Sequence, residues 1–305
     1  MEVSLIICTR NRAQQLTRCL DSVRRITSWI DWELIMVDNG STDETSDVAY
    51  EFIRTASVTT RYVLEPNPGL GNGRNAGVAI AHGEILAFTD DDCYPAPDFL
   101  DRVRAAFEDP SVGYITGRIM LHDPADYPIT INESIIPRTF PPRSYLHGGA
   151  VQGANMAFRR SVLHDIGGFD PLFGTGSLFS TEDVDAASRA SLVGWKGRYC
   201  PEVVVRHHHG RKASDAPALL KSYCIGRGAY HMKLLLRSHR FLWFARGIYG
   251  AFRRWTPHGE ATFWEGVGAA QYAYICISQR IRPRSGPPKK GAGLRPSLLR
   301  DIDKE

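Results

Sequence analysis

The segment Ile85-Leu86-Ala87-Phe88-Thr89-Asp90-Asp91-Asp92 decides the fold class of this 305-residue chain. Its first five residues have the length and character of a buried strand, and three acidic residues follow at once. Adjacent carboxylates repel one another unless a positive charge lies among them. A divalent cation would relieve that repulsion, and carboxylate oxygens suit hard ions such as Mg²⁺ or Mn²⁺. A solvated acidic turn is the alternative, but the preceding strand favours a metal site.

Strand-like runs alternate with helical patterns through the first 120 residues. A helix should start near Ser41 or Thr42, either of which could cap it, with Glu44 in its first turn. The other expected elements are strands 3–8, 33–37, 60–64 and 85–89 and helices 13–23 and 69–82. Such alternation builds βαβ units. We therefore predict an α/β fold with a Rossmann-like, mostly parallel sheet and helices on both faces.

Polar segments follow three of these strands, namely Cys8-Thr9-Arg10, Asp38-Asn39-Gly40 and Asp90-Asp91-Asp92. Ligands of such sheets bind beyond the carboxyl ends of the strands, so the three segments should converge on one crevice. Asp38 could accept a hydrogen bond from a base or ribose there, or could cap the helix that follows. The glycine-rich residues 69–77 could admit a phosphate close to the backbone, or could permit tight helix–sheet packing.

After residue 120 the pattern loosens. Residues 122–150 contain five prolines and are typical of an irregular excursion, and strands are expected at 151–158 and 198–205. From residue 213 the pattern is helical up to Pro283, where Pro, Gly, Lys and Arg become frequent. We expect a catalytic domain over residues 1–212, a helical C-terminal region over 213–282 and a flexible tail over 283–305.

Composition and charge narrow the class of protein. Six dispersed cysteines without a CxxC pair argue against a zinc site or a disulfide framework and fit a reducing cytoplasm. The chain starts directly with a strand-like run, so no signal peptide is expected, and residues 261–279 are too polar for a membrane span. Residues 1–205 hold 18 Lys and Arg against 27 Asp and Glu, whereas residues 206–305 hold 19 against 6. The resulting charges of −9 and +13 indicate an anionic partner for the C-terminal part.

Residues 241–255 carry apolar side chains at helical spacing with arginines beside them. The apolar positions are Phe241, Ala245, Ile248, Phe252 and Trp255, and the arginines are Arg246, Arg253 and Arg254. An interfacial helix on anionic lipid needs this pattern. A helix packed on the catalytic domain with solvated arginines is the alternative. We expect a cytoplasmic protein that lies peripherally on the inner face of the cell membrane.

Several motifs occur in a fixed order along the chain. They are SLIICTRNR (4–12), VDNGSTD (37–43), GNGRNAG (71–77), DDD (90–92), GANMAFRR (153–160), GGFD (167–170) and TEDVD (181–185). In this combination the sequence closely resembles the family-two inverting glycosyltransferases with the GT-A fold, over roughly residues 3–210. Asn39 departs from the second aspartate that many relatives carry, which affects only the details of base recognition.

The resemblance implies roles on the donor side. Residues Thr9, Arg10 and Asp38 would hold the base and ribose of a nucleoside-diphosphate sugar, and Arg74 would approach from the glycine-rich segment. Asp90 would lie near the ribose and sugar, and Asp91 would support the cluster. Asp92 would bind the Mn²⁺ or Mg²⁺ ion that bridges the diphosphate. A histidine completes such metal sites, which implies His207 from the triplet 207–209, with His209 second; a surface turn is the alternative.

The acceptor side is implied at the second acidic cluster. Asp183 would be the general base that removes the proton of the acceptor hydroxyl, with Glu182 and Asp185 as rivals. Inversion needs a base on the face opposite the leaving group, so two separated clusters suit it. Glu182, Arg159 and Arg160 are candidates for contact with the acceptor or the diphosphate, although the arginines could simply cover a helix surface.

The sequence thus predicts a metal-dependent inverting glycosyltransferase that moves a sugar to a hydroxyl of a saccharide or lipid-linked acceptor. A sugar nucleotidyltransferase is an alternative, but it would not require the second cluster, and the lysine of its usual loop is missing. A non-catalytic sugar- or nucleic-acid-binding module is the other. No nucleic-acid partner is expected, because no reading motif is recognisable.

Overall fold

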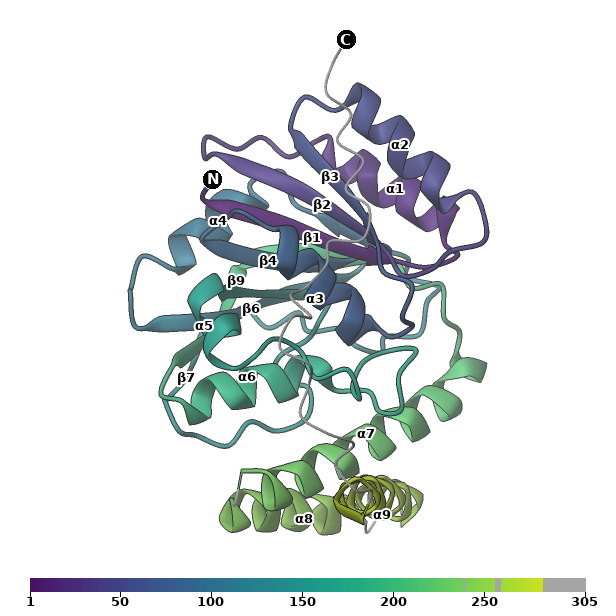
Figure 1. Ribbon diagram of the computed structural model, residues 1–305, viewed down its shortest axis with the longest axis vertical. Helices are drawn as coiled ribbons and strands as arrows, with labels where there is room; N and C mark the ends of the chain where they lie inside the picture. Colours follow the sequence, from purple (N-terminus) through teal and green to yellow (C-terminus); the bar gives the residue numbers. More distant parts are fainter. Residues whose placement is uncertain (239, 256–258, 282–305) are drawn as a thin grey trace.

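The computed structural model describes residues 1–238, 240–255 and 259–281 and is built around one nine-stranded sheet (Figure 1). The sheet order is β3-β2-β1-β4-β8-β6-β9-β5, and β7 pairs with β9 outside this path. The strands are β1 (Val3–Thr9), β2 (Trp32–Asp38), β3 (Thr59–Leu64), β4 (Ile85–Asp90), β5 (Cys93–Pro95), β6 (Val112–Leu121), β7 (Arg138–Phe140), β8 (Asn155–Arg159) and β9 (Lys196–His207).

Most strands point the same way. Strands β1 to β4 pair in parallel, and β6 and β9 are parallel to each other. Strand β8 lies between β4 and β6 and is antiparallel to both, so β6 and β9 share the direction of β4. The short strands β5 and β7 are antiparallel to β9. The predicted mostly parallel sheet is confirmed, and β8 is its internal exception.

Helices cover both faces of the sheet, as predicted (Figure 1). Alternate residues of a strand point to opposite faces, so Leu5 and Ile7 pack with α1, α2 and α4, whereas Ile6 packs in the second core with α3, α5 and α6. The helices of these two layers are α1 (Ala13–Val23), α2 (Thr45–Thr55), α3 (Leu70–Ile80), α4 (Phe99–Ala106), α5 (Arg160–Asp165) and α6 (Glu182–Leu192).

Two predicted element starts are wrong. Helix α2 begins at Thr45 with Glu44 at the N-cap position, rather than near Ser41. Asp38 Oδ1 accepts a hydrogen bond from the Ser41 amide and so holds the preceding residues in a turn. The strand expected at 151–158 begins at Asn155, because residues 152–155 form a turn closed by the bond from the Asn155 amide to the Gln152 carbonyl.

The described residues after 212 are mainly helical. They form a short 3₁₀ turn (Ala213–Asp215), α7 (Ala216–Leu236), α8 (Phe241–Trp255) and α9 (Gly259–Ile281). Helices α7 and α9 pack closely where Gly228 faces the Glu265 backbone and Gly268 faces the Ile225 backbone. Among the helices described, none has both the length and the apolar character needed to cross a membrane. The predicted tail at 283–305 lies outside the described residues, and the division at residue 212 stays a prediction.

Candidate active site

A cavity of about 590 Å³ opens at the carboxyl ends of β1, β2 and β4. Residues from several distant parts of the chain line it, among them the strand ends, the glycine-rich start of α3, the start of α6 and the middle of α7. Both acidic clusters reach it, since Asp90, Asp91, Asp92, Glu182 and Asp183 are all in its wall. The predicted convergence of the strand ends is therefore seen. All residues of Cys8-Thr9-Arg10 and Asp90-Asp91-Asp92 line the cavity, and Asn39 is the residue of Asp38-Asn39-Gly40 that lines it.

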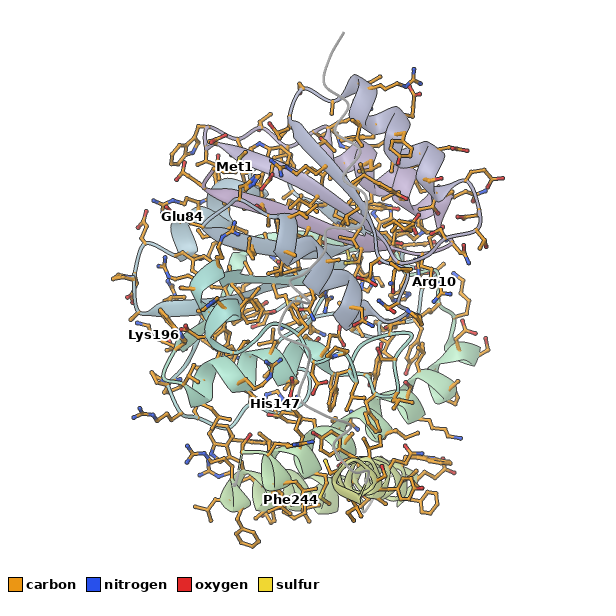
Figure 2. All side chains as sticks on the ribbon, in the orientation of Figure 1. Met1, Arg10, Glu84, His147, Lys196 and Phe244 are labelled. Atoms are coloured by element: carbon orange, nitrogen blue, oxygen red, sulfur yellow. The ribbon has the colours of Figure 1, made fainter. Side chains whose placement is uncertain are left out.

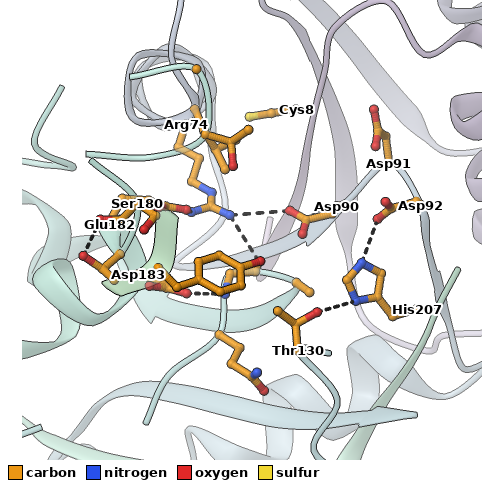
Figure 3. Close-up of a pocket in the computed structure, with 18 of the residues that line it drawn as sticks. Cys8, Arg74, Asp90, Asp91, Asp92, Thr130, Ser180, Glu182, Asp183 and His207 are labelled. Atoms are coloured by element: carbon orange, nitrogen blue, oxygen red, sulfur yellow. Dashed lines mark hydrogen bonds and ion pairs between the residues drawn. The ribbon is translucent and has the colours of Figure 1, made fainter. Parts of the chain in front are cut away.

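Arg74 joins the two acidic clusters (Figure 3). Its side chain is 2% exposed, donates to Glu182 Oε1 at 2.6 Å and lies 3.5 Å from Asp90 Oδ1. Burial lowers the pKa of a guanidinium, but the charges of Glu182 and Asp90 outweigh this and raise the pKa of Arg74. The resemblance implied that Arg74 approaches the nucleotide. In this structure Arg74 bridges the carboxylates of Asp90 and Glu182.

Asp183 lies at the start of α6, where it faces the cavity. Thr181 precedes the helix with a left-handed φ of 82°, which directs the chain into it. Asp183 Oδ2 accepts the amide of Gly153 at 2.8 Å. Burial, followed by the nearby charge of Glu182, raises the pKa of Asp183 to about 7, and Arg74 only partly offsets this rise. A carboxyl group with a pKa near neutrality can take up a proton at physiological pH.

Asp185 points away from the cavity into a buried ion-pair network. Its Oδ2 accepts Arg189 Nε at 2.8 Å, and its Oδ1 lies 2.6 Å from Lys233 Nζ on α7. Lys233 also pairs with Asp170 Oδ2 at 2.6 Å. Burial opposes ionisation of Asp185, but Lys233 and Arg189 together lower its pKa. With its oxygens held in this way, Asp185 is poorly placed to act as a base, and the network anchors α7 to α6.

We expect the substitution Lys233→Met to lower the free energy of unfolding by about 3 kcal/mol, because it leaves buried carboxylates with fewer partners. Urea unfolding followed by circular dichroism measures the loss. Lys221→Met is the matched control, because Lys221 lies exposed on the same helix and contacts only the Trp264 ring among the interactions described. Equal midpoints for the two variants would show that the network does not contribute to stability.

His207 is the member of the histidine triplet that reaches the first acidic cluster (Figure 3). Its Nε2 lies 3.2 Å from Asp92 Oδ1, and its Nδ1 lies 3.5 Å from Thr130 Oγ1. His208 Nδ1 instead lies 2.9 Å from the Tyr94 hydroxyl, and His209 Nδ1 accepts the amide of Arg211. Register explains the difference, because His207 ends β9 directly opposite Cys93 of β5.

These groups fit a divalent cation. Possible ligand atoms of Asp90, Asp92, Cys93 and His207 all lie within 4.8 Å of one another. Although burial opposes it, the hydrogen bond with His207 and the charges of His207 and Arg12 lower the pKa of Asp92 to about 2, so this carboxylate is ionised. Arg12 donates to Asp92 Oδ2 at 2.6 Å, on the oxygen that does not face His207. Carboxylate oxygens suit Mn²⁺ or Mg²⁺, and His207 adds one imidazole nitrogen to the group.

Of the three residues predicted to contact the base and ribose, two line the cavity and one does not. Thr9 and Arg10 line the cavity, whereas Asp38 lies just outside its wall. Asp38 Oδ2 accepts the Tyr62 hydroxyl at 2.9 Å, and its other oxygen accepts the Ser41 amide. Direct contact between Asp38 and a nucleotide therefore stays a prediction, and in this structure the residue shapes the turn after β2.

Asn39 has a structural role next to that turn. Its side-chain amide donates to the carbonyls of Glu65 and Asn67, and its oxygen accepts the Gly69 amide at 2.9 Å. All three bonds hold the segment that leads into α3. The departure at position 39 thus places a group that both donates and accepts where an aspartate could only accept.

Arg159 and Arg160 lie outside the cavity, so the prediction that they contact an acceptor or diphosphate does not fit their placement. Arg159 donates to the backbone carbonyls of 107, 109 and 112, and Arg160 donates to those of 81 and 83. Because β8 is antiparallel to β4, its end lies beside Ile85, at the edge opposite the cavity. In Figure 2 that edge is marked by Glu84, far from Arg10; the Arg160 amide donates to the Glu84 carbonyl.

Several cavity residues were not singled out from the sequence. They are Arg12, Thr130, Arg211, Tyr223 and Arg227. Arg12 lies in the first motif and could have been noticed there. Tyr223 and Arg227 are four residues apart on α7 and therefore share one face of that helix, but only its packing against the catalytic core directs this face into the cavity.

Comparison with solved structures supports the fold. A mannosyltransferase from Pyrobaculum calidifontis, PcManGT, solved with GDP-Man and Mn²⁺, is 22% identical, with a TM-score of 0.57 over 91% of this chain and 75% of that one. Residues 1–349 of S. aureus TarS, solved with UDP-GlcNAc, are 18% identical, with a TM-score of 0.61 over 81% of this chain and 72% of that one. These likenesses show that the chain has the GT-A fold of the two enzymes.

Sequence comparison identifies the family. Residues 4–167, more than half of the chain, match the profile of glycosyl transferase family 2, and the chain belongs to that family. It is 26% identical to glycosyltransferase AglE of Haloferax volcanii over 236 residues, covering 77% of this chain and 75% of AglE. It is 36% identical over 163 residues to the PGL/p-HBAD biosynthesis glycosyltransferase of Mycobacterium bovis BCG, but covers only 56% of it.

Proposed function

We propose that this protein is a metal-dependent inverting glycosyltransferase that moves a sugar from a nucleoside diphosphate to a hydroxyl of a saccharide or lipid-linked acceptor. One observation carries the proposal: a single cavity contains the cation-binding group Asp92 and His207 and, across Arg74, the separate carboxylate Asp183. Solved relatives of the same fold hold GDP-Man with Mn²⁺ or UDP-GlcNAc.

The donor side would be formed by the strand ends. Asp92 and His207 would hold the cation, with Asp90 and Asp91 beside it, and Thr9 and Arg10 would contact the nucleoside. When bound, the ion supplies positive charge that stabilises the departing diphosphate. Arg12 keeps one oxygen of Asp92 occupied, so that the oxygen facing His207 remains directed into the site.

Asp183 would supply the base. The acceptor oxygen attacks the anomeric carbon as the bond from that carbon to the diphosphate oxygen breaks, and the acceptor proton passes to Asp183. Attack from the side opposite the leaving group inverts the anomeric centre. Gly153 orients the carboxylate through its amide, and the burial that raises its pKa to about 7 increases its basicity. Glu182, held by Arg74, supports this arrangement.

The cellular setting follows from the same proposal. A lipid-linked acceptor would lie in a membrane, and the basic C-terminal part would bring the enzyme to an anionic surface on the cytoplasmic side. Among the curated relatives, one is named for pre-mycofactocin and another for PGL/p-HBAD biosynthesis, so related proteins serve different products. We expect no nucleic-acid partner.

The test is a panel of nucleoside-diphosphate sugars incubated with the protein, Mn²⁺ and simple saccharide acceptors, with release of nucleoside diphosphate as the readout. We expect release from one donor class, stimulated by acceptor. Release of pyrophosphate from a nucleoside triphosphate and a sugar phosphate would instead identify a sugar nucleotidyltransferase. Binding of a sugar without any release would identify a non-catalytic module.

A further inference from the structure

Helix α9 presents an apolar face to solvent. Phe263, Tyr274 and Ile277 are 60%, 72% and 56% exposed, respectively. They lie at positions that recur every three or four residues, so they form one stripe, and exposed Gly266 and Ala270 lie between them. The opposite stripe, with Glu265, Tyr272 and Cys276, is buried. An exposed apolar stripe of this length is unusual on a soluble domain and indicates a binding surface.

Helix α8 extends this apolar face. Leu242 and Tyr249 are exposed, with exposed Arg246 between them on the same stripe, and Phe241 is exposed next to them. Trp243 and Gly247 face inward, where Gly247 packs against the ring of His231. The sequence prediction therefore chose a neighbouring stripe: Phe241 is outward as expected, but Ala245 and Ile248 are half-buried. The side chains of 252 and 255 lie outside the described residues.

The two helices form the end of the molecule that lies farthest from β1, β2 and β3 (Figure 1). Helix α7 connects this end to the active site, because Tyr223 and Arg227 line the cavity while Arg227 Nε also donates to Glu265 of α9 at 2.9 Å. In Figure 2, Phe244 marks the same end on α8. Arg227 thus connects the cavity wall to α9, so a surface that binds α8 and α9 would lie near the cavity.

We propose that the outer faces of α8 and α9, defined by Phe241, Leu242, Tyr249, Phe263, Tyr274 and Ile277, dock on an anionic lipid bilayer. The proposal deepens the function proposed above by naming the surface that brings the cavity to a lipid-linked acceptor. Two features of this surface favour a bilayer as its partner: its apolar side chains and the arginines beside them. The face is apolar with Arg240 and Arg246 exposed at α8, and an interfacial helix combines these same elements.

Charge argues against a second copy of the chain as the occupant. Residues 240–281, which include both helices, carry five Arg against two Glu, so two copies of this region would repel each other when brought together. An anionic bilayer attracts the same charge and offers an apolar interior to the aromatic and aliphatic side chains. The bilayer therefore satisfies both properties of the surface, whereas a second copy satisfies only its apolar character.

Vesicle flotation of the full chain tests the proposal. We expect binding to vesicles that contain phosphatidylglycerol, with less binding at high salt and with phosphatidylcholine alone. Leu242→Glu/Tyr274→Glu should weaken vesicle binding by about ten-fold or more, because each change puts a charge where an apolar side chain enters lipid. Both side chains are exposed, so folding should be unaffected, and an unchanged melting temperature confirms this.

Trp29→Glu/Ile135→Glu is the matched control, since it adds the same charge at two comparably exposed apolar residues on other parts of the molecule. It should bind vesicles as the wild type does. Equal binding by both variants, or no binding by the wild type, would overturn the proposal. A wild-type dimer that the Leu242→Glu/Tyr274→Glu variant converts to a monomer, with no vesicle binding, would overturn it in favour of self-association. Donor turnover is measured without vesicles, so a failure of either proposal leaves the other standing.

Discussion

The variant Asp183→Asn is expected to retain its fold and to bind donor normally while its turnover falls by roughly 10²–10⁴-fold, the usual contribution of a general base. The amide oxygen of asparagine can still accept the Gly153 amide, so the loop opposite α6 should stay in place. An amide cannot take up the proton of the acceptor hydroxyl. Steady-state kinetics with the donor that the panel identifies give the loss, and isothermal titration calorimetry gives the donor affinity.

The pH dependence of turnover gives a second reading of the same residue. Because the pKa of Asp183 is raised to about 7, the base is increasingly protonated below that pH, and kcat should fall about ten-fold per pH unit there. Above pH 7 the carboxylate is ionised and ready to accept a proton, so kcat should level off. Asp183→Asn should lose this acid limb. The charges of Glu182 and Arg74 act on this pKa in opposite directions: that of Glu182 raises it and that of Arg74 lowers it.

Asp185→Asn is the comparison that separates catalysis from structure. Asp185 is a buried carboxylate two residues away, but it pairs with Lys233 and Arg189 instead of facing the cavity. We expect this variant to melt at a lower temperature and to keep most of its turnover when assayed well below that temperature. If Asp185→Asn lost turnover and Asp183→Asn did not, the assignment of the base would be wrong.

Asp92→Ala is expected to reduce donor turnover by at least about 100-fold and to weaken binding of Mn²⁺ and of the nucleotide sugar together, since cation and diphosphate stabilise each other in one site. EDTA should abolish activity of the wild type, and added Mn²⁺ or Mg²⁺ should restore it. Calorimetric titration with Mn²⁺ alone gives a readout that does not depend on turnover. Full activity in the chelator would discard the metal-dependent mechanism.

Cys93→Ala is the matched control for the metal site. The Cys93 sulfur belongs to the same group of possible ligands, but hard ions prefer oxygen donors to thiolates. We expect this variant to keep Mn²⁺ binding and most of its turnover. A loss as large as that of Asp92→Ala would indicate a softer metal with a thiolate ligand.

The sequence predicted the first half of the sheet closely. Apolar runs mark β1, β2 and β4 to within one or two residues at each end, because a strand buried on both faces must be apolar along its length. The crevice was predicted as well, since parallel strands expose their carboxyl ends at one edge, and Thr9 and Asp90 are the last residues of two such strands. Strand direction after residue 150 was not readable in this way. The motif at 153–160 was treated as one unit, and reversal of β8 places Asn155 near the cavity edge and Arg159 at the opposite edge.

The sequence by itself determined the α/β class and the two acidic clusters, because these depend on local periodicity and on residue types next to strand or helix ends. Within the clusters, the resemblance to the family selected Asp92 and Asp183 as candidates. Only the tertiary structure decided that Arg74 bridges the two acidic clusters and that Lys233 of α7 pairs with Asp185, which makes Asp185 a poor candidate for the base. It also decided which stripes of α8 and α9 remain exposed. Each of these rests on contacts between different secondary-structure elements. A helix that is apolar on nearly every side does not reveal from its own sequence which side its neighbours will cover.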